Sequence, residues 1–112
     1  TCAASVGLAN HDAIAAAKAG VEGLIRSAAA SYASANIRFN GVAPGLVDTP
    51  LASRLTGNEA SLKASTAMHP LGRIGAAGEV ARVVKMLLEP ESSWITGQII
   101  GIDGGIARVR GR

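Results

Sequence analysis

The sequence predicts an α/β domain in which helices cover a parallel sheet. Two segments, 10–35 and 76–89, have the helical spacing of apolar residues, and two others, 36–44 and 96–105, are short and β-rich. Along the chain they follow the order helix, strand, loop, helix, strand. Such alternation implies a parallel sheet with helices packed on its faces.

Residues 10–35 are expected to form one long helix, because they are rich in alanine and contain no proline. Apolar or small residues recur at helical spacing: Ile14, Val21, Ile25 and Ala28. Asn10 is expected to be the N-cap, since its side-chain oxygen can accept a hydrogen bond from a free backbone N–H. Asp12 in the first turn suits the positive end of the helix dipole. Lys18 then shares a face with Ile14.

The two β-rich segments are expected to be short strands that end in turns. Residues 36–44 predict a buried strand that ends at a Pro-Gly turn. Its apolar residues are Ile37, Phe39 and Val42. The second strand lies within 96–105 and ends at Asp-Gly-Gly. Asp103 is expected to fix this turn rather than to bind a metal, because no cluster of His, Cys and carboxylate residues accompanies it.

Residues 46–75 are expected to form a substrate-binding or lid loop with a possible short helix near 60–67. Glycine, asparagine and proline make this segment too irregular for a core element. The second helix is expected over 76–89 and is ended by Pro90. Its apolar stripe consists of Val80, Val83, Val84, Leu87 and Leu88.

Composition and charge narrow the class of protein. A length of 112 residues with 48% hydrophobic residues suits one small globular domain. The net charge is only +3, and the basic tail with Arg108, Arg110 and Arg112 contains no aromatic residue, so a solvated tail is favoured over nucleic-acid binding. Cys2 is the single cysteine, and no apolar run approaches the ~18 residues of a membrane span. We therefore expect a cytoplasmic protein with neither a membrane nor a nucleic-acid partner.

Four sequence blocks together resemble the C-terminal half of the short-chain dehydrogenase/reductase family. In chain order they are "AAAKAG", "NIRFNGVAPGLVDTP", "HPLGRIG" and "WITGQIIGIDGG". The resemblance implies that residues 1–112 are a single partial domain, the C-terminal part of a Rossmann-like doubly wound parallel sheet that binds NAD or NADP. It also implies an oxidoreductase that transfers hydride between the nicotinamide and a small alcohol or carbonyl substrate.

The blocks with which this family holds the rest of the dinucleotide have no counterpart in the 112 residues. They are the glycine-rich turn after the first strand, the residue that selects the adenosine ribose, and the Asn-Ala-Gly block. The glycines of "GRIGAAG", residues 72–78, have the wrong spacing and follow no strand, so a phosphate loop is not expected there. Residues 1–112 alone are therefore expected to be inactive and to lack appreciable dinucleotide affinity.

In this family a Tyr-x-x-x-Lys pair on the long helix carries the reaction. The resemblance assigns Lys18 to the lysine, which bonds the nicotinamide ribose and lowers the tyrosine pKa from the same helix face. The tyrosine position is Ile14, which cannot give or take a proton. Thr1 stands thirteen residues before Ile14, where the family has a serine that orients the substrate carbonyl. A threonine hydroxyl has the same donor and acceptor capacity.

The block "PGLVDT" resembles the loop that holds the nicotinamide carboxamide. The resemblance implies that Pro44 and Gly45 shape the turn under the ring. It also implies that the backbone around Val47 and the hydroxyl of Thr49 contact the carboxamide. No residue of the chain is expected to ligate a metal.

The two histidines are weaker candidates. His11 lies three residues before Ile14, hence on about the same face, and an imidazole suits proton transfer near neutral pH. Helix capping or simple exposure is the stronger interpretation of His11. His69 could touch a substrate from its loop, but exposure to solvent is expected.

Three functions are compatible with these residues. The first is an NAD(P)-dependent oxidoreductase in which substrate or water supplies the proton relay that Ile14 cannot. The second is a catalytically impaired relative that serves in assembly or binding. The third uses Thr1 as a nucleophile activated by its own amine. It is disfavoured, because the family spacing already explains Thr1 and the fold is unlike that of such hydrolases.

A homotetramer is expected, with interfaces through residues 10–35 and 76–105. Small residues on the long helix leave its outer faces almost free of bulky side chains: Ala17, Gly20, Gly23, Ala28, Ala29, Ala30 and Ala33. A helix that faced water on those sides would carry more charge. Small residues instead let a symmetry-related helix approach to ~8 Å.

Overall fold

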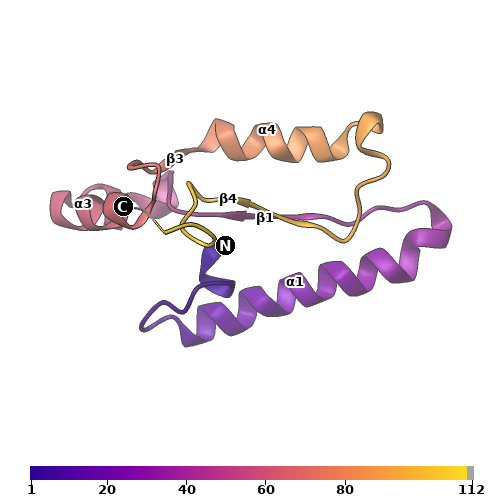
Figure 1. Ribbon diagram of the computed structural model, residues 1–112, viewed down its shortest axis with the longest axis horizontal. Helices are drawn as coiled ribbons and strands as arrows, with labels where there is room; N and C mark the ends of the chain where they lie inside the picture. The colour runs from indigo at the N-terminus through magenta and orange to yellow at the C-terminus, as the bar shows by residue number, and fades with distance from the viewer. Residues whose placement is uncertain (111–112) are drawn as a thin grey trace.

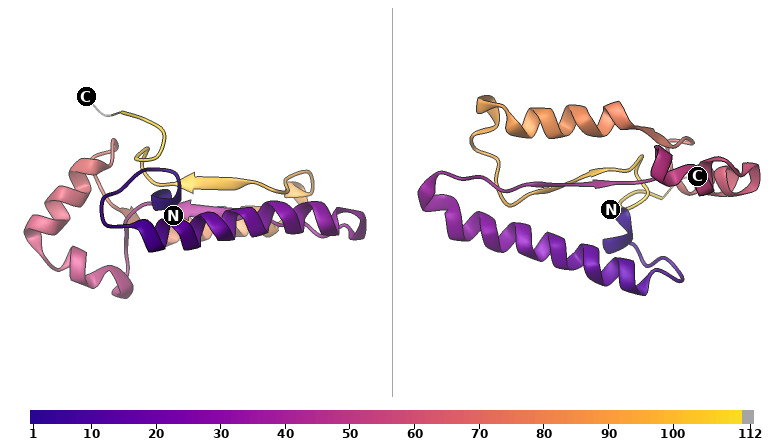
Figure 2. Two further views of the ribbon diagram at one scale, coloured as in Figure 1. Left: turned by 90° about the horizontal axis from the view of Figure 1, so that it is seen from below. Right: turned by 180° about the vertical axis from the view of Figure 1, so that it is seen from behind.

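The computed structural model describes residues 1–110 and has three layers (Figure 1). A parallel pair of strands, β1 (Gly41–Pro44) and β4 (Ile99–Ile102), lies between two helices. Helix α1 (Asp12–Tyr32) covers one face of this pair and helix α4 (Ala77–Leu88) covers the other, which the view from behind in Figure 2 also shows. The predicted α/β class and parallel sheet are therefore confirmed.

Helix α1 does not begin as predicted at an Asn10 cap. Asn10 has a φ of 61°, in the left-handed region, which a short polar side chain tolerates but an N-cap residue does not use. His11 takes the N-cap position and makes no side-chain capping hydrogen bond. The helix ends at Tyr32 and leads into the 3-10 helix η2 (Ala33–Ala35), after which Asn36, with a φ of 57°, turns the chain. The cap prediction was wrong because the chain turns sharply at Asn10.

Strand β1 is shorter than the predicted segment 36–44. Its ladder with β4 begins where the Gln98 carbonyl accepts the first N–H of β1 at 2.8 Å. Just before the strand, hydrogen bonds of the Asn40 side chain take the place of backbone bonds between the two segments. Its Nδ2 donates to Ile95 O at 2.8 Å, and its Oδ1 accepts the Gln98 N–H at 3.0 Å. Ile37, which was expected to be buried in the strand, is 48% exposed because it precedes the paired region.

Segment 46–75, predicted as an irregular loop, contains several short elements. They are β2 (Val47–Asp48), the 3-10 helix η3 (Pro50–Ala52), α2 (Ser53–Thr56), α3 (Glu59–Met68) and β3 (Gly75–Ala76). The short helix expected near 60–67 is confirmed as α3, and its N-cap Asn58 accepts a backbone hydrogen bond at 2.9 Å. Strands β2 and β3 pair in parallel, with Val47 opposite Gly75, so the two ends of the segment lie side by side.

Helix α4 follows the prediction for 76–89, and side chains fix both of its ends. At its start the Glu79 carboxylate accepts the Ala76 N–H at 2.8 Å, which is the reciprocal half of a capping box. At its end Arg38 Nη2 donates to the Leu87 carbonyl at 2.7 Å. Backbone groups that a helix end leaves without intrahelical partners are thus satisfied by this chain itself.

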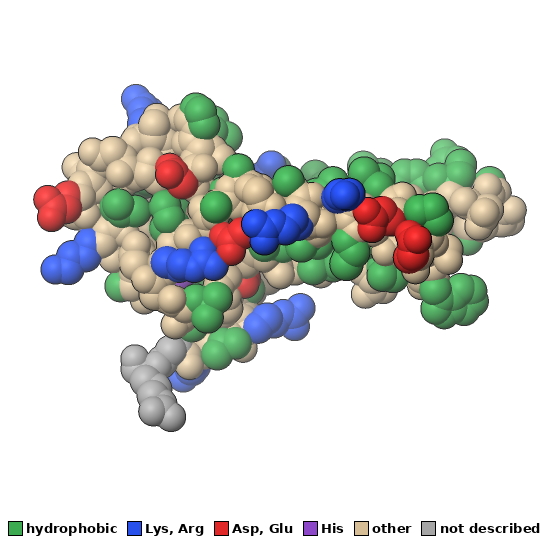
Figure 3. Space-filling view, turned by 90° about the horizontal axis from the view of Figure 1, so that it is seen from above, with side chains coloured by type: hydrophobic (Ala, Val, Ile, Leu, Met, Phe, Trp, Pro, Cys, Tyr) green, Lys and Arg blue, Asp and Glu red, His purple; other side chains and the backbone are tan. Residues whose placement is uncertain are grey.

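The core is small, and much of it is made of small residues. The buried hydrophobic residues are Cys2, Ala3, Ala29, Ala43 and Leu87. The 3-10 helix η1 (Cys2–Ala4) supplies two of these residues, and another, η4 (Pro90–Ser92), contains the buried Ser92. Of the stripe predicted on α4, Leu87 is buried but Leu88 is 77% exposed, and Trp94 beyond the helix is 98% exposed. Figure 3 shows apolar side chains scattered among polar ones on the face that carries α4, so the described residues leave some apolar surface uncovered.

The predicted interface required the small residues of α1 to face away from the sheet, but not all of them do. Ala29 is only 6% exposed, and its Cβ is 3.6 Å from where a Cβ on Gly97 would lie. Its assignment to the outer face was wrong, because the turn of the helix directs it at the segment that leads into β4. Gly20 and Gly23 do border open space, and Leu24, 66% exposed, stands on the uncovered side.

Candidate functional site

A cavity of about 550 Å³ opens at the carboxyl end of β1, beside β2 and the first turns of α4. Its lining includes Thr1, Pro44, Gly45, Val47 and Thr49, all of which the sequence predicted for the site. On the opposite side the wall is apolar and comes from α4. The carboxyl ends of parallel strands are where ligands bind in doubly wound sheets. The structure thus brings the predicted loop and Thr1 to one place.

A second cavity, of about 270 Å³, adjoins the first between α1 and the sheet. Lys18 lines it together with Thr1 and Pro44, which belong to both cavities. The ammonium group of α1 and the loop after β1 therefore border the same region. Ile14 lies four residues before Lys18 and is 49% exposed, so no hydroxyl occupies the position where the family carries its tyrosine.

The loop after β1 runs close to its neighbours. A Cβ on Gly45 would lie 2.6 Å from His69 Nε2 and 3.0 Å from Asp103 Cα, so only glycine fits there without displacement. The Gly45 N–H extends the ladder to Ile102 O at 3.1 Å. Further on, Thr49 is the N-cap of η3, where its Oγ1 accepts the Ala52 N–H at 3.4 Å.

His69 lies inside the protein, which corrects the expectation that it is exposed on a loop. Its exposed fraction is 5%. Its Nε2 accepts the Leu46 N–H at 3.2 Å, and its Nδ1 lies 2.7 Å from the Ser65 carbonyl. The burial arises because α3 ends just before His69 and returns the chain beneath the loop after β1. No spacing or motif in the sequence indicated this contact.

The other two polar candidates have local structural roles. His11 Nδ1 lies 2.7 Å from Ala9 O, next to its own turn. Asp103 accepts the Gly105 N–H at 2.9 Å through Oδ1 and the Ala107 N–H at 3.1 Å through Oδ2. The prediction that Asp103 fixes the turn after the last strand is confirmed.

An ion pair fixes the segment opposite the loop. Arg73 bonds both carboxylate oxygens of Glu79, at 2.9 Å and 2.7 Å. The hydrogen bonds from Arg73 and from the Ala76 N–H lower the pKa of Glu79 to about 2, and the carboxylate raises the pKa of Arg73 in turn. Because Ala76 belongs to β3, which pairs with β2, this pair supports the strand beside the cavity.

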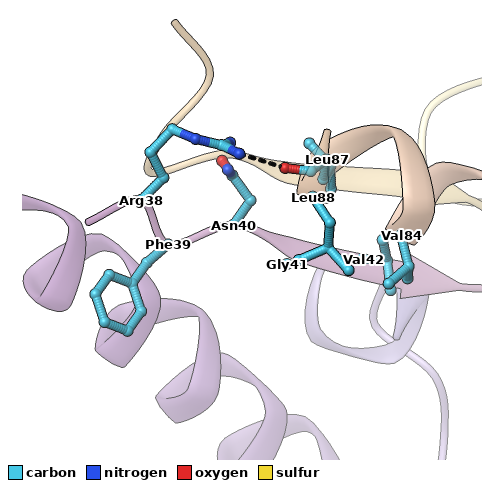
Figure 4. A pocket seen from close by; sticks show the side chains of 8 residues that line it. All are labelled: Arg38, Phe39, Asn40, Gly41, Val42, Val84, Leu87 and Leu88. Carbon is cyan, nitrogen blue, oxygen red and sulfur yellow. Dashed lines mark hydrogen bonds between the residues drawn. The ribbon is translucent and has the colours of Figure 1, made fainter. Parts of the chain in front are cut away.

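A further cavity, of about 240 Å³, lies between α4 and the residues that lead into β1 (Figure 4). Figure 4 shows the Arg38 and Asn40 side chains on the side of the α4 terminus and the Phe39 ring turned away from them. Both polar side chains are engaged with backbone carbonyls of the segment from Leu87 to Ile95. Arg38 therefore serves to fix the end of α4 and Asn40 the segment that leads into β4, and the cavity offers little chemistry.

Two structural tests bear on other classes of function. Within residues 1–110, no group of three or more His, Cys, Asp and Glu side chains is arranged to hold a metal ion. Over the same residues, no helix combines the length and the apolar character needed to cross a membrane. Arg108 and Arg110 of the basic tail are exposed, and Arg112 lies outside the described residues.

Comparison with known proteins gives a consistent result. Residues 1–107 match the family model described as Enoyl-(Acyl carrier protein) reductase. The chain is 47% identical over 92 residues to 3-oxoacyl-(acyl-carrier-protein) reductase of Thermotoga maritima, covering 82% of this chain and 37% of that protein. A short-chain type dehydrogenase/reductase from Mycobacterium ulcerans has a TM-score of 0.91 at 32% identity, over 99% of this chain and 40% of that one. Pseudomonas aeruginosa RhlG, in a complex with NADP, has a TM-score of 0.89 at 27% identity, over 96% of this chain and 42% of that one.

The chain spans about two fifths of the length of these relatives. Its layers and parallel strands are those of the C-terminal part of their fold. The family model matches nearly the whole chain, and the loop, lysine and final turn that carried the resemblance lie within the match. The chain therefore belongs to the short-chain dehydrogenase/reductase family and corresponds to its C-terminal portion.

Proposed function

We propose that this chain forms the nicotinamide and substrate half of an NAD(P)-dependent short-chain dehydrogenase/reductase that interconverts an alcohol and a carbonyl compound. One observation carries the proposal. The loop after β1 and Thr1 line one cavity, and Lys18 lines the adjoining one that shares Thr1 and Pro44. When bound, the nicotinamide supplies or accepts the hydride, and the residues of this chain bind and orient the two reactants.

Each residue has a role that suits its position. The Lys18 ammonium donates to the hydroxyls of the nicotinamide ribose from the cavity between α1 and the sheet. The Thr1 hydroxyl orients the substrate oxygen from the wall shared by both cavities. The Thr49 hydroxyl and the backbone around Val47 hold the carboxamide, and Pro44 with Gly45 form the floor of the turn. The apolar wall from α4 keeps water from the reacting atoms.

The proton step differs from that of relatives with a tyrosine, since Ile14 has no group that ionises. A hydride transfer to a carbonyl leaves an alkoxide that must gain a proton. In this protein the substrate or a bound water supplies it, at a cost in rate. The alternative function is that of a catalytically impaired relative that serves in assembly or binding. The uncovered apolar surface of α1, with Leu24 66% exposed, supports that alternative.

Residues 1–112 act together with a first half that carries the phosphates and adenosine, and segment 46–75 serves as the lid over the substrate. The complete protein is a cytoplasmic homotetramer with contacts through residues 10–35 and 76–105. Exposed apolar side chains in both regions, among them Leu24 on α1 and Leu88 on α4, support this assembly. Neither nucleic acid nor membrane is a partner.

Titration of the complete protein with NADH and with NADPH tests the proposal and distinguishes the two cofactors. Lys18→Met should lower the affinity for the preferred cofactor about 10- to 100-fold, the usual effect of losing a hydrogen bond from a charged group. Lys85→Met is the matched control, because Lys85 is 80% exposed on α4 and away from both cavities. Residues 1–112 alone should bind neither nucleotide appreciably. Absence of binding to the complete wild type would exclude the oxidoreductase and leave the assembly role.

A further inference from the structure

His69 stands where three segments meet. It follows directly after α3, whose Ser65 carbonyl is bonded by its ring. On one side the ring reaches the loop after β1 at Leu46, and a Cβ on Gly45 would clash with Nε2 at 2.6 Å. On another side it packs near Gly104, where a Cβ would be 3.5 Å from His69 Cβ. Its own carbonyl accepts from Gly72, which closes the turn behind it.

These contacts require one form of the imidazole ring. The Ser65 carbonyl can only accept, so Nδ1 must carry the proton in the 2.7 Å contact. The Leu46 N–H can only donate, so Nε2 must offer its lone pair across 3.2 Å. A ring that is 5% exposed has little access to water as a substitute partner. Both bonds are made only by the neutral ring with its proton on Nδ1.

We infer that His69 is a positioning residue for the nicotinamide loop, residues 44–49, and that it holds this loop through the Leu46 N–H. The inference rests on the proposed function, which places the nicotinamide ring on Gly45 and its carboxamide near Val47 and Thr49. Leu46 lies between these contacts, so a shift of its backbone would move both. Because the other end of the ring is anchored on α3, the lid segment and the nicotinamide loop are held in one geometry.

Two conservative variants separate the two hydrogen bonds in the complete protein. His69→Asn keeps a donor at the position of Nδ1 but leaves the Leu46 N–H without its acceptor. His69→Gln places an amide oxygen near the position of Nε2 and gives up the bond to Ser65. The probes are the reduced dinucleotide that the wild type prefers, NADH or NADPH, and the matching nucleotide without nicotinamide, ADP-ribose or its 2′-phosphate.

His69→Asn should weaken binding of the reduced dinucleotide at least about fivefold, since the part-buried Leu46 N–H loses its acceptor. Binding of the nicotinamide-free nucleotide should stay within about twofold. His69→Gln should retain most of the affinity for both. Equal losses for the two variants, or equal losses for the two ligands, would overturn the inference in favour of a general role in stability. A wild type that binds neither ligand would instead refute the proposed function.

The wild-type protein offers a test that needs no variant to fold. A long-range ¹H–¹⁵N spectrum of the histidine rings should show the His69 proton on Nδ1 and none on Nε2. Hydrogen exchange at the Leu46 amide should be slow in the same sample, because the amide is bonded to the buried ring. A ring with its proton on Nε2, or rapid exchange at Leu46, would refute the contact on which the inference depends.

Discussion

Helices α1 and α4 cover opposite faces of the same strand pair, but only α4 has side chains of this chain bonded to the backbone near both of its ends. Leu87 of α4 is 7% exposed, Glu79 fixes the first turn of the helix, and Arg38 bonds the Leu87 carbonyl in its last turn. A backbone group at each end thus finds a side-chain partner among the described residues.

Helix α1 has almost none of these supports. It has no side-chain cap, and its one buried residue is the small Ala29, where α4 buries a leucine. Ile14, Val21 and Leu24 are 49%, 49% and 66% exposed, and Lys18 is exposed as well. The helix that carries the predicted chemistry therefore leaves much of its surface accessible, including Lys18 and Val21, which line the cavity between α1 and the sheet. The difference indicates that a ligand and partner subunits are expected to bind the surface of α1 that this chain leaves exposed.

The largest expected effect comes from restoring a proton donor on α1. In the complete protein, Ile14→Tyr should raise kcat for a simple ketone or alcohol about 10²- to 10⁴-fold, the usual contribution of a positioned acid or base. Ile14→Phe is the matched control, since it has the same ring without the hydroxyl and should bring no gain. Steady-state kinetics with saturating cofactor measure both. If the tyrosine variant folds and gains nothing, α1 no longer serves this chemistry.

On α4 the sharpest change is Leu87→Ala, which removes its buried leucine side chain. It should lower the free energy of unfolding by about 2–5 kcal/mol, through lost burial and the cavity left behind. Leu51→Ala removes the same atoms from a residue that is 96% exposed and should stay within about 0.5 kcal/mol. Urea denaturation of the complete protein gives both values. Similar losses for the two variants would mean that α4 is not the better anchored helix.

The outer side of α1 should be sensitive to charge if it is an interface. Leu24→Glu should weaken assembly at least about tenfold, because a carboxylate would be buried against a symmetry-related helix. Leu71→Glu introduces the same charge at a leucine that is 69% exposed outside the proposed interfaces and should leave assembly unchanged. Light scattering over a range of concentrations reports the subunit number. A monomeric wild type would refute the assembly. Ligand binding would then be the remaining explanation for the exposed surface of α1.

The smallest expected effect concerns the first turn of α4 and depends on pH. The folded pKa of Glu79 is about 2 against an ordinary 4.5, so the carboxylate stabilises the fold fully above its ordinary pKa and loses this effect as pH falls towards 2. Glu79→Gln should therefore lower the urea midpoint near neutral pH and match the wild type near pH 2. For Arg73→Gln, the difference in urea midpoint from the wild type should also become smaller as the pH falls, but to a lesser extent. A difference in urea midpoint that stays constant with pH would show that the charge of Glu79 is not what stabilises the fold.

The contiguous parts of the candidate site could be predicted from the sequence. Pro44 to Thr49 form one block of neighbouring residues, and Lys18 and Thr1 are reached by counting along the chain. That these groups line adjoining cavities depends on the parallel crossover, which the order of helices and strands implied. His69 was missed because its contact to Leu46 spans 23 residues and leaves no pattern in the sequence.

The sequence by itself determined what depends on short-range order. Helical spacing predicted α4 and Pro90 its end, and an Asp before two glycines predicted the turn that Asp103 makes. These features arise from residues within a few positions of one another, where backbone geometry and side-chain hydrogen bonds act directly.

Only the tertiary structure decided where the strands begin, which face of α1 is covered and which polar groups are buried. Asn40 delays the ladder of β1 through bonds to residues 55 and 58 positions away. Ala29 is turned to the sheet by the packing of α1 against the segment before β4. A buried polar group must take whatever partner the fold brings to it, and such partners lie far away along the chain.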